Sequence, residues 1–173
     1  MWEQRAVLLE FDLARVLRGS WSDHGGRAAL LSVAPQVRGK PVLDLGGGTG
    51  RTTPWLVLLS DDYVAIDYTP EMIRLFRRAS PKLDVRIGDA RALEGIEDER
   101  FGLVLFSFNG IDSVDHEGRQ SALRSMHRVL SRDGFSYCTH NTAGPCFLAP
   151  PWRPAGPIER ESWMPWYWAV RAA

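Results

Sequence analysis

A short apolar run followed by closely spaced glycines most constrains what this chain can fold into. Val42, Leu43 and Leu45 are apolar, as expected of a strand buried on both faces of a parallel sheet, and Asp44 lies near its end. Glycines follow at positions 46, 47, 48 and 50, ahead of a segment with helical character. A strand that leads through a glycine loop into a helix is how α/β proteins bring backbone close to a nucleotide. This stretch therefore predicts an α/β fold with a nucleotide-binding turn after its first strand.

The glycine spacing narrows the kind of nucleotide. A dinucleotide fingerprint, Gly-x-Gly-x-x-Gly, would need glycine where Arg51 stands, and a phosphate loop ending in Gly-Lys-Ser/Thr is absent. Gly46, Gly48 and Gly50 fit Gly-x-Gly-x-Gly instead. Asp44 would repel a pyrophosphate but could accept a hydrogen bond from an amine. The alternative is a tight left-handed turn with no ligand, which glycines also permit.

Two further carboxylates follow predicted strands. Asp67 comes directly after an apolar run at 63–66, about 20 residues beyond the first glycine, where Rossmann-like folds bind a ribose diol. A carboxylate can accept from both ribose hydroxyls. The alternative role, a helix cap, is one that Thr69 already offers. Asp89 follows a predicted strand at 83–87, with a plain turn residue as its alternative.

Four segments, in this order, resemble the motifs of class I methyltransferases that use S-adenosyl-L-methionine. They are 42–50, the Asp-x-Ser/Thr-x-x-Met form at 67–72, Gly-Asp-Ala at 88–90, and 107–112 after a predicted strand at 101–106. The resemblance covers residues 41–141. It implies a Rossmann-like, doubly wound, mostly parallel α/β sheet with helices on both faces, and S-adenosyl-L-methionine as cofactor. The cofactor-binding residues that it implies are Asp44, Gly46, Gly48, Thr49, Gly50, Asp67, Tyr68, Met72, Asp89, Ala90, Ser107 and Phe108.

The same resemblance implies a methyl acceptor and its contacts. The segment 107–112 lacks the Asn/Asp-Pro-Pro-Tyr/Phe tetrapeptide of some DNA and protein amide methyltransferases, which favours a small-molecule N or O acceptor. If the acceptor is a hydroxyl, a general base would help, and His140 and His116 are the candidates. The candidate substrate contacts are Trp21, Asn109, Asp112 and Asn141. Packing or turn roles stay open for Trp21, Asn109 and Asp112, as does simple packing for Phe108.

The chain divides into three parts of one domain. Residues 1–40 are predicted to form a helical cap, with a helix at 2–18, a loop at 21–26 and a short helix at 28–33 stopped by a proline. Residues 41–143 form the core, with a short helix and loop at 91–100, a helix at 120–130, a turn at 132–134 that gives Gly134 a positive φ, and a strand at 135–140. Residues 144–173 are a proline- and tryptophan-rich tail with a closing strand at 166–171. This tail leaves the sheet abbreviated at its sixth and seventh strands, and its aromatic residues are a candidate homodimer contact.

Charge, hydropathy and cysteine content argue against several other classes of protein. Formal net charge is +0, which does not favour broad binding to nucleic acid or to an anionic membrane. No apolar run reaches the roughly 18 residues of a membrane span, and the first residues lack the order of a signal peptide. Two cysteines make neither a disulfide framework nor a zinc site, so we expect no metal and a cytoplasmic location.

Two rival functions remain beside a methyltransferase. One is a protein that binds the cofactor without catalysis, such as the partner of an active subunit. The other is an NAD-linked oxidoreductase, which the failed dinucleotide spacing disfavours.

Overall fold

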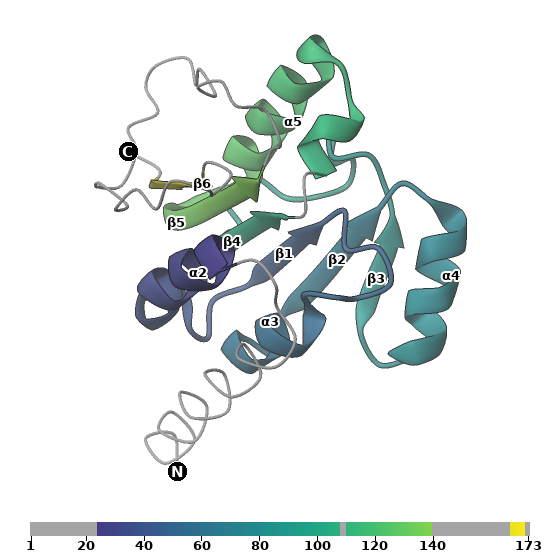
Figure 1. Cartoon of the computed structure of the whole chain (residues 1–173), viewed down its shortest axis with the longest axis horizontal. Coiled ribbons are helices and arrows are strands. Elements are labelled where there is room, and N and C mark those ends of the chain that lie inside the picture. The colour runs from purple at the N-terminus through teal and green to yellow at the C-terminus, as the bar shows by residue number, and fades with distance from the viewer. Residues whose placement is uncertain (1–23, 108–109, 140–166, 172–173) are drawn as a thin grey trace.

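A six-stranded sheet forms the centre of the protein (Figure 1). The structure, a computed structural model, describes residues 24–107, 110–139 and 167–171. The strand order is β3-β2-β1-β4-β5-β6; β1 to β5 run parallel, and β6 pairs antiparallel with β5. The strands are β1 (Val42–Leu45), β2 (Tyr63–Asp67), β3 (Asp84–Ile87), β4 (Phe101–Phe106), β5 (Leu130–Thr139) and β6 (Tyr167–Arg171).

The strand order reverses between β1 and β4. From β1 the chain adds β2 and β3 on one side, and then returns to add β4 and β5 on the other side. Ligands of open α/β sheets bind where the strand order reverses in this way. The predicted doubly wound, mostly parallel fold is confirmed.

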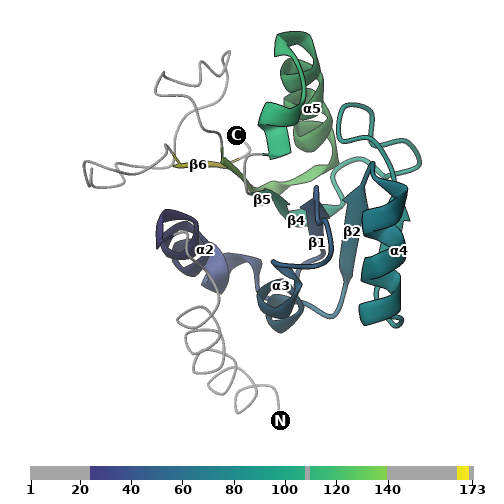
Figure 2. The same ribbon diagram turned by 45° about the vertical axis from the view of Figure 1, so that its right-hand side comes forward.

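Helices cover both faces of the sheet (Figure 2). One face packs against α2 (His24–Val37), α3 (Thr53–Leu59) and α4 (Pro70–Ala79), and the other packs against α5 (His116–Val129) and the 3-10 helix η1 (Gly110–Ser113). Every residue of β1, β2 and β4 is buried. Side chains along a strand alternate between the two faces, so strands covered on both sides are apolar almost throughout.

Helix α2 differs from its prediction. It begins at His24 rather than 28, and it continues past Pro35 to Val37. Gly25 and Gly26 lie in its first turn, where backbone N–H groups have no intrahelical acceptor in any case. Pro35 removes one hydrogen bond near the carboxyl end, but Val37 is fully buried in the core. Burial of the apolar face therefore outweighs the proline, and the predicted stop is wrong.

Strand β5 is longer than predicted, and the predicted turn at 132–134 is absent from it. Phe101 pairs with Leu130, and Leu103 pairs with Phe135, so the extra residues of β5 form a bulge. Gly134 is not among the residues with positive φ. A Cβ atom there would lie 2.7 Å from Leu130 Cδ1. Glycine is required at this position by close packing, and not by a left-handed turn.

Helix α5 also begins earlier than predicted, at His116. The Asp115 carboxylate accepts a hydrogen bond of 2.8 Å from Gly118 N and thereby caps the first turn. The predicted helix at 120–130 is correct as far as Val129, and Leu130 is already the first residue of β5.

The segment 91–100 contains turns and no helix, contrary to the prediction. Arg128 of α5 explains why. Its guanidinium donates to the carbonyl oxygens of Ile96 (2.8 Å), Leu93 (2.9 Å) and Ala92 (3.2 Å), and it pairs with Asp98. These carbonyl groups therefore accept hydrogen bonds from a side chain of α5 and not from the backbone N–H groups of a local helix.

The predicted helix at 2–18, the last residue of the core strand predicted at 135–140, and most of the tail (144–166) lie outside the described residues. The closing strand is present as β6, whereas the abbreviated edge and a homodimer contact through the tail stay predictions. Among the described residues, no helix has both the length and the apolar composition needed to span a bilayer.

We expect Arg128→Ala to lower the free energy of unfolding by about 2 kcal/mol, because it leaves three carbonyl groups without their charged donor. Urea denaturation checks this. Arg124→Ala is the matched control, because Arg124 lies on the same helix and bonds only the exposed Ser121 hydroxyl among the described contacts. Equal losses in the two variants would contradict the role given to Arg128.

Candidate cofactor site

The loop after β1 depends on left-handed backbone at alternate glycines. The φ angles are +62° at Gly46, +55° at Gly48 and +93° at Gly50, a region that other residues rarely adopt. At Gly50 the space is also filled, since a Cβ atom there would lie 2.9 Å from a ring carbon of Phe76. Thr49 is exposed between them. The predicted Gly-x-Gly-x-Gly pattern thus has a conformational cause in this fold.

Asp67 ties this loop to the next helix. Its Oδ2 accepts from Gly48 N at 2.9 Å, and its Oδ1 accepts from Thr69 N at 2.8 Å. Asp67 also does part of the capping expected of Thr69, whose own hydroxyl does not cap α4. Each carboxylate oxygen has two lone pairs, so Asp67 retains acceptor capacity for a diol. The side chain is 8% exposed.

Asp44 lies fully buried beneath the loop. Its Oδ2 accepts from Thr52 Oγ1 at 2.5 Å and from Tyr63 OH at 2.8 Å. Its Oδ1 is buried and accepts no hydrogen bond from the described residues. Burial raises the pKa of Asp44 from 3.8 to about 6, and the two hydroxyl donors offset this only in part.

The two hydroxyl partners of Asp44 were not predicted as site residues. Thr52 stands at the N-cap position of α3, but its hydroxyl donates to Asp44 and does not cap the helix. Tyr63 pairs with Val42, which puts its side chain on the same face of the sheet as that of Asp44. Finding it required the register of two strands, which the sequence does not contain.

We expect the Asp44 pKa to appear as a pH dependence of stability. Because its folded pKa lies above its unfolded value, its contribution is complete below about pH 3.8 and is lost as the pH rises through about 6. Relative to Asp44→Asn, the wild type should lose roughly 2 kcal/mol of unfolding free energy between about pH 4.5 and pH 7. Denaturant unfolding of both proteins across this range measures it. A constant difference would show that Asp44 is not buried as described.

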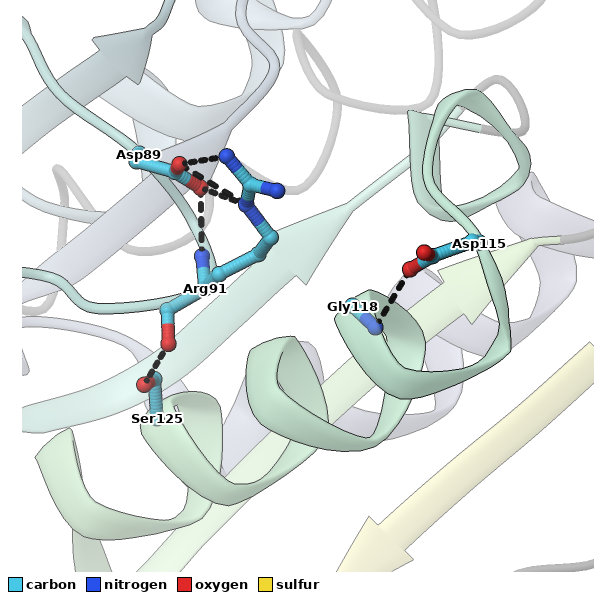
Figure 3. Close-up of polar contacts among 5 residues, drawn as sticks. All are labelled: Asp89, Arg91, Asp115, Gly118 and Ser125. Carbon is cyan, nitrogen blue, oxygen red and sulfur yellow. Dashed lines mark hydrogen bonds and ion pairs between the residues drawn. The ribbon is translucent and has the colours of Figure 1, made fainter.

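Asp89 follows β3, and its carboxylate forms an ion pair with Arg91 (Figure 3). Its Oδ1 accepts from Arg91 N at 2.8 Å and from Arg91 Nε at 3.0 Å. Its Oδ2 accepts from the same Nε at 2.8 Å and from Nη2 at 2.5 Å. These hydrogen bonds hold the pKa of Asp89 below its usual value. The carboxylate is 42% exposed, so it is accessible to a ligand. Arg91 was not predicted as a site residue.

Apolar side chains lie near the two acidic positions. Tyr68, next to Asp67, is 71% exposed, and Met72, in the first turn of α4, is 40% exposed. Large apolar side chains left in water are candidates for ligand contact. Ala90 is half-buried beside Asp89, and Ser107 is buried at the end of β4.

The remaining predicted residues are less closely tied to this site. Asp112 lies in η1, 3.8 Å from Arg119 Nη2. His116 is exposed in the first turn of α5, with its Nε2 atom 2.9 Å from Gln120 Nε2. Their roles stay predictions. Five further candidates lie outside the described residues: Trp21, Phe108, Asn109, His140 and Asn141.

The matched family agrees with this arrangement. A model of the family described as "Methyltransferase domain" matches residues 42–134, which run from β1 into β5. The chain belongs to this family. Its membership supports S-adenosyl-L-methionine as the cofactor, as predicted from the motifs.

Individual relatives give the same result. An uncharacterised methyltransferase-like protein of Schizosaccharomyces pombe is 33% identical over 54% of this chain and 35% of its own length. A demethylmenaquinone methyltransferase of Renibacterium salmoninarum is 32% identical over 69% of this chain and 50% of its own. The chain therefore spans half or less of the length of these curated relatives.

Solved structures confirm the fold. A TehB-like S-adenosylmethionine-dependent methyltransferase from Corynebacterium glutamicum superposes with a TM-score of 0.60 at 25% identity, over 83% of this chain and 76% of the other. An S-adenosylmethionine-bound amino pentose methyltransferase from Micromonospora echinaspora gives a TM-score of 0.62 at 20% identity, over 83% and 61%.

Proposed function

We propose that the protein binds S-adenosyl-L-methionine and transfers its methyl group to a small-molecule N or O acceptor. The observation that carries this proposal is the placement of three carboxylates, Asp44, Asp67 and Asp89, at the carboxyl ends of the neighbouring strands β1, β2 and β3. Strand order alone brings them to one edge of the sheet.

The donors and acceptors of this edge fit the three parts of the cofactor. The buried Asp44 Oδ1 lacks a described partner, and a cationic amine would suit it. Asp67 retains lone pairs for a ribose diol, and Asp89 is accessible to the amino group of adenine. Tyr68 and Met72 offer exposed apolar surface for the base.

The protein's part in the reaction is binding and alignment. The cofactor, when bound, supplies an electrophilic methyl group on a sulfonium ion. The glycine loop and the three carboxylates fix its orientation, which reduces the entropic barrier to in-line attack by the acceptor. An amine acceptor needs no side-chain base. For a hydroxyl acceptor we propose His116 or His140 as the base that removes the proton.

Two similar proteins support a small-molecule acceptor. One is named for demethylmenaquinone and the other for an amino pentose, neither of which is a macromolecule. The candidate contacts of the acceptor are Asp112, which lies in η1, and Asn109 and Asn141, which follow β4 and β5 in the sequence.

Calorimetric titration with S-adenosyl-L-methionine, its demethylated product and NAD tests cofactor binding. We expect binding of the first two, and a 10- to 100-fold loss of affinity in Asp67→Asn, because one charged acceptor becomes a neutral amide. Asp61→Asn is the matched control, since Asp61 is exposed just before the other end of β2. Binding of NAD alone would overturn the proposal.

Methyl transfer from labelled cofactor to a metabolite extract tests catalysis separately. A labelled product is expected. Binding without transfer would instead support the rival function, a cofactor-binding protein without activity.

A further inference from the structure

Two similar Asp–Arg ion pairs lie close together in the sequence, and only one of them includes a residue of the candidate site. Asp84 and Arg86 pair on β3, with Arg86 Nη2 and Asp84 Oδ2 2.6 Å apart. Asp89 and Arg91 pair just beyond the carboxyl end of the same strand, at 2.5 Å. Both pairs are exposed, so solvent screening leaves them little effect on stability. The pair beyond the carboxyl end of β3 lies at the candidate site, so its arrangement bears on ligand binding.

Arg91 fixes the orientation of the Asp89 carboxylate. It presents three N–H groups to it: the backbone N, Nε and Nη2. A carboxylate offers about four acceptor sites. The Nε–H group is shared between Oδ2, at 2.8 Å, and Oδ1, at 3.0 Å. Three N–H groups therefore hold the carboxylate in one orientation, and because one of them is shared, they leave acceptor capacity for one further donor. A side-on fork of this kind is a geometry that arginine provides and lysine does not.

Arg91 is in turn fixed by α5 (Figure 3). Ser125 Oγ donates to the Arg91 carbonyl oxygen at 2.8 Å. The Arg91 side chain passes close to Gly118, where a Cβ atom would lie 3.3 Å from Arg91 Cδ. The charge of Asp115, which caps that turn, also favours the arginine cation. The loop that carries Asp89 is thereby anchored to α5.

We propose that Arg91 is a positioning residue for Asp89 and that it sets the selectivity of the site for a 6-amino purine. The arginine holds the carboxylate so that its remaining acceptor site faces the amino group of adenine. A purine with an oxygen at that position would meet an acceptor and would bind poorly. This proposal rests on the proposed function, because it assumes adenine beside Asp89.

Calorimetry with two ligands tests the proposal. The ligands are S-adenosylhomocysteine and its inosine analogue, which carries a carbonyl oxygen in place of the amino group. We expect the wild type to prefer the adenine ligand by roughly tenfold or more. The preference should fall by roughly three- to tenfold in Arg91→Ala and in Arg91→Gln, which keeps more of the stem. Arg86→Ala, which removes the other pair, should keep the wild-type ratio.

A ligand-free readout accompanies the ratio. The Asp89 carboxyl pKa, followed by NMR, should rise toward its usual value in Arg91→Ala and stay unchanged in Arg86→Ala. Thermal melting checks that each variant is folded. If Arg91→Ala does not fold, Arg91→Gln replaces it in both measurements.

The outcomes separate this proposal from the proposed function. A wild-type ratio in both Arg91 variants, or tighter binding of the adenine ligand to them, would overturn the positioning role. So would wild-type binding of both ligands with equal affinity, while the proposed function would stand. Failure of the wild type to bind either ligand would overturn the proposed function and this proposal with it.

Discussion

The hydrogen bond from Gly48 N to the Asp67 carboxylate joins the two halves of the candidate site. Gly48 has a left-handed backbone, with a φ of +55°, and its N–H donates to Asp67 Oδ2 at the end of β2. Asp67 in turn accepts from Thr69 N, where α4 begins. One carboxylate therefore sets the shape of the glycine loop and the start of the next helix. The same carboxylate is the one proposed to bind the ribose, so loop geometry and ligand binding depend on a common group.

The site also contains a polar group that opposes folding. Asp44 is fully buried, and its pKa of about 6 reflects the cost of removing a carboxylate from water. Two hydroxyl groups satisfy one oxygen and leave the other without a described partner. Such unfavourable groups persist where function requires them, which agrees with a cationic ligand group nearby.

Much of the fold could be predicted because its strongest features are local. Continuous apolar runs predicted β1 and β4. The glycine spacing predicted the loop after β1, and the position of Asp67 predicted the acidic residue that ends β2. The errors arose where tertiary contacts decide. Burial of Val37 carries α2 past Pro35, close packing rather than a turn requires Gly134, and Arg128 replaces the helical donors expected at 91–100. Tyr63 lies at the site because of the register between β1 and β2, and Arg91 is held there by its contact with α5. Neither the register nor this contact can be predicted from a short stretch of sequence.

Amide chemical-shift mapping with S-adenosylhomocysteine tests the central claim most directly. The central claim is that Asp44, Asp67 and Asp89 form one binding edge of the sheet. The largest chemical-shift changes should therefore fall at 46–50, 67–72 and 88–91, at the carboxyl ends of β1, β2 and β3. Saturable shifts confined to the opposite edge of the sheet, or no shifts at millimolar ligand, would contradict the account.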